Sequence, residues 1–297
     1  MIKYMLKNVH FAIVKIGEIM KLKPPVSFQG GKQRLAHKIL EIMKARSGSF
    51  DGHPFFDLCC GSGAVTIEAI NNDEQFSSYT MVDNSVWGDF WESVSNGSFS
   101  TKDFHSYVTM MPEKSMIKEF LEKLSKESPY GEPLSHVYKY LLLQAGSFGR
   151  KHIWIDGGEW KNTSFCSYWQ PTETSSRRYP VNPMMPMPGT IEKRVEGICK
   201  KMSGLVSGVK LDVSKTTNFP DHAIIYIDPP YLGTTAYGGN IDVFKWAKDV
   251  RKNSYAKIFI SESKPMEGKM SWCVSKNRTK GNISGGASGV SEWLIEF

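Results

Sequence analysis

The sequence predicts an α/β protein with an open sheet, helices on both faces of that sheet, and an inserted lobe. Three observations predict this fold. Short apolar runs of strand type carry or precede an acid at four places, Asp57, Asp83, Asp212 and Asp228. The first run leads through a Gly61-Ser62-Gly63 turn into a helical pattern, as in the first β-turn-α unit of a nucleotide-type site. A long stretch rich in aromatic and basic residues separates the second run from the third.

The composition is that of an ordinary globular chain with a surplus of basic residues. Its 297 residues allow one large domain or two smaller ones. The net charge of +7 fits a polyanionic partner, nucleic acid first. No apolar run reaches the ~18 residues of a membrane span, so we expect no membrane contact. Five cysteines without zinc-site spacing, and no secretory signal, favour a reducing cytoplasm.

The N-terminal part holds one candidate ligand-binding motif. Residues 1–23 precede it and are interpreted as an extension. The stretch Phe28-Gln29-Gly30-Gly31-Lys32 then leads into a helical pattern. Two glycines ahead of a helix let the backbone approach a ligand, the start of the helix favours an anion, and Lys32 adds a positive charge. The alternative is a plain glycine turn before an amphipathic helix.

The first two apolar runs carry the acids Asp57 and Asp83. Asp57 opens the glycine motif, and the adjacent Cys59 and Cys60 are interpreted as small packing residues rather than a redox pair. Gly61 and Gly63 stand where the backbone would approach a ligand. Asp83 follows about twenty residues later, a spacing that suits a carboxylate binding a ribose diol. The alternative for Asp83 is a helix N-cap.

The stretch from Trp87 to Leu205 departs from the strand–helix alternation. Helical patterns cover residues 117–124 and 137–143, and the residues from Gly146 to Gly189 predict a loop-rich lobe. Residues 150–215 hold 11 Lys and Arg against 6 Asp and Glu, a local excess of +5. Basic residues near aromatic ones suit phosphates and unstacked bases, although a small satellite core with a charged rim is the alternative. The candidate DNA contacts are Arg150, Lys151, Arg177 and Arg178.

The most informative stretch is Ile224-Ile225-Tyr226-Ile227-Asp228-Pro229-Pro230-Tyr231. Proline cannot continue a central strand, so Asp228 is expected at the carboxyl end of a buried strand, where open α/β sheets bind ligands. A carboxylate, a fixed carbonyl and an aromatic face there could receive a flat ring that bears an amino group. A strand ending in an ordinary turn is the alternative. Asp212 ends a neighbouring candidate strand and could accept a hydrogen bond from an adenine amino group, and further strands are expected at 257–261 and 291–295.

Together these motifs resemble the amino-methyltransferases that use S-adenosylmethionine, and most closely the Dam-type DNA adenine methyltransferases, several of which are carried by bacteriophages. The resemblance implies a Rossmann-like methyltransferase sheet over residues 24–90 and 205–297, and a target-recognition lobe over residues 91–204. It implies cofactor contacts from Asp228 and from Phe28, Gly30, Gly31, Lys32, Asp57, Gly61, Gly63, Asp83 and Asp212. Cys59 departs from the family pattern, which usually has an aromatic residue there.

The resemblance also implies a reaction. Asp228, Pro229, Pro230 and Tyr231 would form the catalytic motif that transfers a methyl group to N6 of an adenine flipped out of double-stranded DNA, and no metal would be needed. Cytosine N4 or a base in RNA is the alternative acceptor, and a non-catalytic DNA-binding protein is the alternative from another class. Nothing in the sequence indicates an obligate protein partner. The expected location is the cytoplasm of a bacterium or of a host cell.

Overall fold

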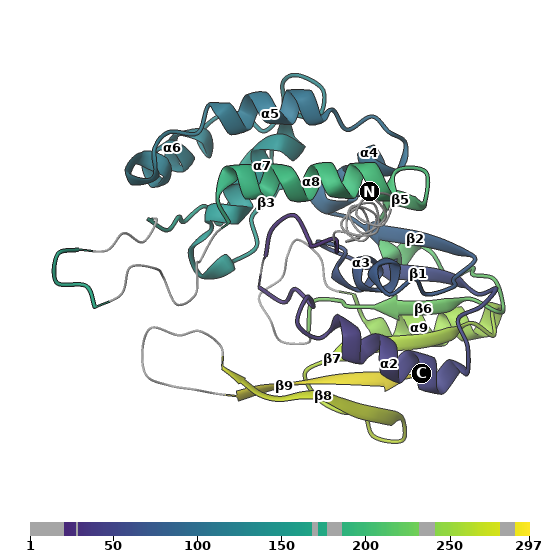
Figure 1. The fold of residues 1–297 in the computed structure, drawn as a ribbon. Helices are drawn as coiled ribbons and strands as arrows, with labels where there is room; N and C mark the ends of the chain where they lie inside the picture. The colour runs from purple at the N-terminus through teal and green to yellow at the C-terminus, as the bar shows by residue number, and fades with distance from the viewer. Residues whose placement is uncertain (1–20, 28, 168–171, 177–185, 232–240, 280–288) are drawn as a thin grey trace, which may run out of the picture.

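A seven-stranded sheet forms the centre of the protein (Figure 1). The computed structural model describes residues 21–27, 29–167, 172–176, 186–231, 241–279 and 289–297. The strand order in the sheet is β5-β2-β1-β6-β7-β9-β8, in which β9 runs antiparallel to both of its neighbours and the other pairs are parallel. The strands are β1 Pro54–Leu58, β2 Ser78–Asp83, β5 Val206–Lys210, β6 Ile224–Ile227, β7 Lys257–Glu262, β8 Met270–Thr279 and β9 Gly289–Glu296.

The strand order creates a reversal point between β1 and β6. The chain proceeds from β1 outward through β2 to β5, and then returns to β6 on the other side of β1. Open α/β sheets bind ligands at such a point, outside the carboxyl ends of the strands. Leu58 of β1 pairs with Ile227 of β6, so the residues that follow these two meet at one edge of the sheet. The predicted fold class, a Rossmann-like sheet, is therefore confirmed.

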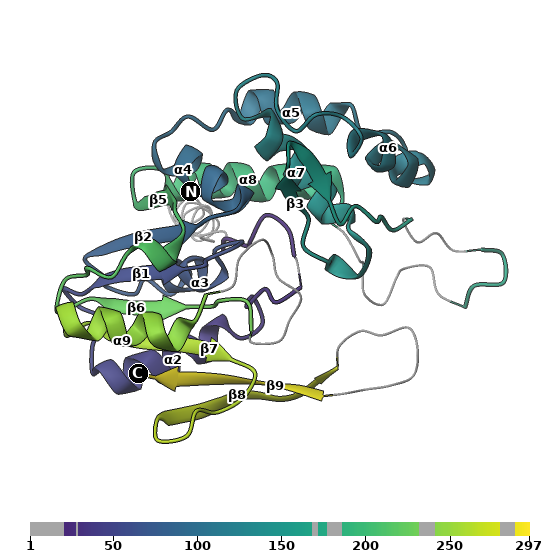
Figure 2. The same cartoon turned by 180° about the vertical axis from the view of Figure 1, so that it is seen from behind.

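Helices cover both faces of the sheet (Figures 1 and 2). On one face, the apolar sides of α2 (Ala36–Ser47), α3 (Ala64–Asn71) and α4 (Val86–Ser95) join the larger hydrophobic core. On the other face, α9 (Val243–Asn253) packs with its buried Trp246 and Val250 against a second, smaller core. Apolar patterns at helical spacing predicted α2 and α3, whereas α4 was not predicted. Burial of the apolar stripe supplies most of the stability of such helices.

The inserted lobe is mainly helical. It contains α5 (Thr101–Thr109), α6 (Ile117–Leu124), α7 (Ser135–Gly146) and α8 (Pro188–Met202), together with a small hairpin of β3 (Trp154–Asp156) and β4 (Glu159–Lys161). Its core is continuous with that of the sheet. The ring of Trp87 on α4 lies 5.3 Å from that of Tyr140 on α7, in an edge-to-face arrangement. The predicted boundary between residues 90 and 91 therefore falls inside α4, which serves both parts.

Several elements were absent from the sequence-based prediction. Helices α4, α5 and α8 and strand β8 were not anticipated. The segment expected to be loop-rich contains the β3–β4 hairpin and the start of α8. Pro188 begins α8, in the first turn where a missing N–H costs nothing. Of the predicted extension over residues 1–23, residues 1–20 lie outside the described residues. Within the described part of the chain, none of the helices is long and apolar enough to cross a membrane.

Candidate active site

Asp228 stands at the reversal point of the sheet. It directly follows β6, and its backbone N–H donates to the carbonyl of Leu58 at the end of β1, with an N···O distance of 3.2 Å. The next two residues, Pro229 and Pro230, have no N–H to offer a neighbouring strand, so the ladder stops here. The Asp228 side chain is 18% exposed. The prediction that this acid lies at the carboxyl end of a buried strand is confirmed.

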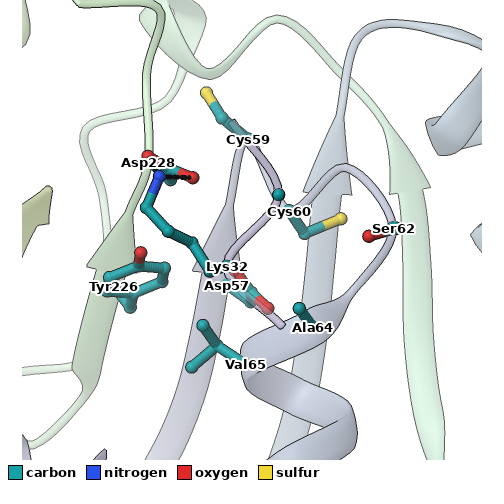
Figure 3. Close-up of a pocket in the computed structure, with 10 residues that line it drawn as sticks. Lys32, Asp57, Cys59, Cys60, Ser62, Ala64, Val65, Tyr226 and Asp228 are labelled. Carbon is teal, nitrogen blue, oxygen red and sulfur yellow. Dashed lines mark hydrogen bonds and ion pairs between the residues drawn. The ribbon is translucent and has the colours of Figure 1, made fainter. Parts of the chain in front are cut away.

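Lys32 reaches Asp228 from the N-terminal glycine motif. Its ammonium nitrogen lies 2.6 Å from each carboxylate oxygen of Asp228 (Figure 3). The same nitrogen lies 3.0 Å from the carbonyl oxygen of Gly30. The side chain of Lys32 is only 4% exposed. Two motifs that stand 196 residues apart in the chain are thus joined by a partly buried ion pair.

Glu292 of β9 completes this group, and sequence reasoning missed it. Its Oε1 lies 3.4 Å from the Lys32 ammonium and accepts a hydrogen bond from the Tyr231 hydroxyl. The Lys32 nitrogen also lies 5.2 Å from the centroid of the Tyr231 ring, within range of a cation–π contact. The signal was present, because period-two alternation puts Glu292 on the same buried face as Leu294. A carboxylate on a buried strand face is rare unless it is paired.

The charges of these three side chains do not balance. One ammonium faces two carboxylates, so the group carries an excess of one negative charge when all three are ionised. Burial alone would lower the pKa of Lys32, but Asp228 and Glu292 together raise it, so this lysine stays protonated. Burial raises the pKa of Asp228 to about 6, with Lys32 opposing the rise and Glu292 adding to it. The pKa of Lys32 is thus raised by its two acidic neighbours, whereas that of Asp228 is raised first by burial and then by Glu292.

A pocket opens beside this group, between Lys32, Asp57, the 59–62 turn and Tyr226 (Figure 3). Its enclosed part measures about 20 Å³, room for roughly one water molecule, so it can take one end of a ligand rather than a whole nucleoside. Asp57 is 1% exposed, and its Oδ2 accepts from the Thr66 hydroxyl at 2.7 Å and from the Thr66 N–H at 3.3 Å. Burial raises the pKa of Asp57 to about 7 in spite of these hydrogen bonds.

The glycine turn is fixed by Asp83 and by a tryptophan. Asp83 Oδ2 accepts from the Gly61 N–H at 2.8 Å, and Oδ1 accepts from the N–H and the hydroxyl of Ser85 at 2.9 and 2.6 Å. The indole N–H of Trp91 donates to the Gly61 carbonyl at 2.7 Å. Ser85, and not Asp83, is the N-cap of α4. Asp83 therefore already positions the turn, and at most part of its acceptor capacity is left for a ribose.

Side-chain packing requires a glycine at position 63, which the sequence did not reveal. We expected it to let the backbone approach a ligand. Its φ is +70°, and a Cβ there would lie 2.4 Å from Trp91 Cζ2 and 2.5 Å from Met81 Cε. The missing side chain makes room for the packing of α4 against the start of α3 instead. Burial and nearby acids raise the pKa of the Cys59 and Cys60 thiols well above its usual value, which agrees with their interpretation as packing residues.

The remaining candidate residues have other hydrogen-bond partners, are exposed, or lie outside the described residues. Asp212 Oδ1 accepts from the N–H and hydroxyl of Ser214, so it caps a short 3₁₀ helix after β5. The carbonyl of Arg150 accepts from the Gln29 N–H at 2.6 Å, which ties the lobe to the N-terminal glycine motif, and Lys151 is exposed. Phe28, Arg177 and Arg178 lie outside the described residues.

Comparison with known proteins adds a weak likeness of fold. No protein-family model and no curated protein matches the chain. A structure of the rRNA methyltransferase AviRa from Streptomyces viridochromogenes aligns with 12% identity and a TM-score of 0.40, over 92% of this chain and 87% of that one. A second structure of AviRa aligns with 12% identity and a TM-score of 0.38, over 89% and 83%. At these values, the function has to be inferred from the residues of this chain.

Proposed function

We propose that the protein is an S-adenosylmethionine-dependent methyltransferase that acts on N6 of adenine in double-stranded DNA. The observation that carries this proposal is the position of Asp228-Pro229-Pro230-Tyr231. The motif leaves β6 at the reversal point of the sheet, beside the pocket under the Gly61 turn. A hydrogen-bond acceptor, an aromatic ring and a ligand pocket thus meet at one strand end, which suits an amino group presented to a bound cofactor.

The residues around the pocket fit the methionine end of this cofactor. An ammonium group needs a buried acceptor, and Asp57 supplies one with its carboxylate on the pocket wall. The N-terminus of α3 lies beside it and favours a carboxylate. The excess negative charge of Lys32, Asp228 and Glu292 favours a cationic ligand such as a sulfonium. When bound, the cofactor would supply an electrophilic methyl group.

The protein's own contribution would be positioning and hydrogen bonding. The Asp228 carboxylate and the Pro229 carbonyl would accept hydrogen bonds from the two N–H groups of the adenine amine. These bonds would draw the nitrogen lone pair out of conjugation with the ring. Tyr231 would stack against the base, and its hydroxyl is already held by Glu292. The target base has to leave the duplex stack to reach this edge of the sheet. Fixed acceptors at a water-poor site act mainly by orientation and electrostatics.

The lobe would hold the DNA. Figures 1 and 2 show it beside the sheet and reaching beyond the carboxyl ends of the strands, where a substrate would arrive. Arg150 and Lys151 lie at the junction of the lobe with the Gly30 motif, close in the chain to the aromatic Phe148, which is 38% exposed. Basic side chains bind phosphates and an exposed aromatic ring can stack on a base. Arg177 and Arg178 are proposed as further contacts.

A transfer assay with a labelled methyl group tests the proposal. Duplex DNA, single-stranded DNA and RNA of matched sequence are offered in parallel, and the modified nucleoside is identified after digestion. The proposal predicts N6-methyl-2′-deoxyadenosine from the DNA duplex as the main product. Methyl transfer to cytosine N4 or to RNA would keep the enzyme class and replace the substrate. No transfer to any acceptor, with cofactor binding intact, would favour a non-catalytic DNA-binding protein.

A further inference from the structure

Glu292 stands where a second acceptor for Lys32 is needed. We infer that Glu292 is a positioning residue that takes over the Lys32 ammonium when the substrate amine engages Asp228. This inference rests on the proposed function and extends it to a residue outside the Asp228-Pro229-Pro230-Tyr231 motif. It follows from the distances around Lys32, from the charges of the three side chains, and from the hydrogen bond that ties Glu292 to Tyr231.

Lys32 occupies the position on Asp228 that the proposed reaction needs for the substrate amine. Its nitrogen lies 2.6 Å from both oxygens of Asp228, an end-on contact that uses both of them. An incoming amine that donates to Asp228 must compete with this contact. Lys32 cannot simply withdraw to water, because its side chain is 4% exposed and a buried ammonium without a partner is costly.

Glu292 supplies the alternative partner at short range. Its Oε1 is already 3.4 Å from the Lys32 nitrogen, so a small rotation of the lysine side chain converts this contact into a full hydrogen bond. An ammonium has three hydrogens to donate, and the bond to the Gly30 carbonyl can persist during the change. Glu292 is 4% exposed and held by Tyr231, so it keeps its place while Lys32 moves.

The exchange would also change the electrostatics of Asp228. With Lys32 on Glu292, the ammonium charge is neutralised there and Asp228 keeps an unshared negative charge. An unshared carboxylate is the better acceptor for the amine, and it favours the positive charge that develops on the nitrogen during methyl transfer. Glu292 would thus act on the reaction through Lys32 and Asp228 without touching the substrate amine.

Three variants test this role. Glu292→Gln keeps the shape and an acceptor oxygen but removes the charge that attracts Lys32, whereas Glu292→Asp keeps the charge. The matched control is Glu296→Gln. Glu296 is an acid of the same strand, and its carboxylate lies 2.8 Å from the Arg46 guanidinium. Each purified full-length variant is measured for thermal unfolding, S-adenosylmethionine affinity by calorimetry, and kcat and KM for duplex DNA across pH 5 to 9.

We expect Glu292→Gln to lower kcat roughly 10- to 100-fold, because Lys32 stays on Asp228 and the amine is misplaced. S-adenosylmethionine affinity should fall less than about tenfold, because Glu292→Gln also removes the excess negative charge that favours the sulfonium. The acid limb of its rate profile should move to lower pH, since the negative charge of Glu292 raises the pKa of Asp228. Glu292→Asp should restore part of kcat and move the acid limb back towards its wild-type pH. Glu296→Gln should behave like the wild type.

The outcomes separate this inference from the proposed function. If the wild type methylates DNA and Glu292→Gln has a normal kcat and an unmoved acid limb, the inference is wrong and the proposed function stands. If Glu292→Gln loses activity only in proportion to lost folded protein, and Glu292→Asp rescues nothing, Glu292 is merely structural and the inference is again wrong. If the wild type transfers no methyl group to any acceptor, both fall together.

Discussion

Replacing Asp57 by Asn should make the ligand-free protein more stable at alkaline pH. Asp57 is 1% exposed, and burial raises its pKa from 3.8 to about 7. A raised pKa means that the folded state binds the proton more tightly than the unfolded state does. The ionised carboxylate therefore destabilises the fold, fully above pH 7 and progressively less as the pH falls towards 4. Asparagine removes the charge, and its side-chain oxygen still accepts from Thr66.

The magnitude follows from the pKa difference. The change from 3.8 to about 7 corresponds to about 4 kcal/mol of unfolding free energy at pH 8, as an upper value. At pH 5 the same difference leaves about 1–2 kcal/mol, because most of the charge is already absent from the folded state. Urea unfolding curves of Asp57→Asn and of the wild type at both pH values measure the two gains.

Thr66→Val should have the opposite effect on stability. It removes the hydroxyl that donates to Asp57 Oδ2 while keeping the volume of the buried side chain. The carboxylate then loses a partner, so this variant should be less stable than the wild type, and more so at pH 8 than at pH 5. An Asp57→Asn protein whose stability relative to the wild type does not depend on pH would refute a desolvated carboxylate at this position. The proposed role of Asp57 adds that Asn should weaken S-adenosylmethionine binding.

Three further predictions concern the site and the lobe. Turnover should fall as the pH drops below about 6, where Asp228 takes up a proton and ceases to be a full acceptor, and a pH–rate profile of kcat measures this. Trp91→Phe removes the donor to the Gly61 carbonyl, so S-adenosylmethionine binding should weaken by about 1 kcal/mol in a calorimetric titration. Unchanged affinity would show that this hydrogen bond does not position the turn. Arg177→Ala with Arg178→Ala should weaken DNA binding and flatten its salt dependence in a titration while leaving cofactor affinity alone, and an unchanged DNA affinity would remove this segment from the interface.

The sequence predicted the sheet edge better than the lobe. Ile224 to Tyr231 combines a buried strand with residues that must end it, so the position of Asp228 follows from local chemistry alone. The lobe helix α8 escaped notice because it follows a proline-rich stretch and its apolar residues Ile191, Val195 and Ile198 are few. Strand β8 was missed because it lies at the sheet edge and carries a weak alternation.

Long-range pairing explains what the sequence could not give. Lys32 was expected to bind an anionic ligand. It binds the Asp228 carboxylate instead, 196 residues away in the chain, and no local pattern encodes that contact. The alternation in β9 marks Glu292 as a buried acid, but its partners follow only from the pairing of β9 antiparallel to β7, which brings its carboxylate to the same edge as Asp228. Gly63 was assigned to ligand approach on its motif, whereas the packing of Trp91 and Met81 decides its identity.

The most direct test of the central claim is Asp228→Ala, assayed for methyl transfer and for cofactor binding on the same preparation. Losing a positioned acceptor of this kind costs about a hundred- to a thousand-fold in rate, so turnover should fall below roughly a hundredth of that of the wild type. S-adenosylmethionine affinity should stay within about tenfold, equivalent to ~1.4 kcal/mol, because Asp57 and the Gly61 turn remain. Near-normal turnover in Asp228→Ala would contradict the assignment of this strand end as the catalytic site.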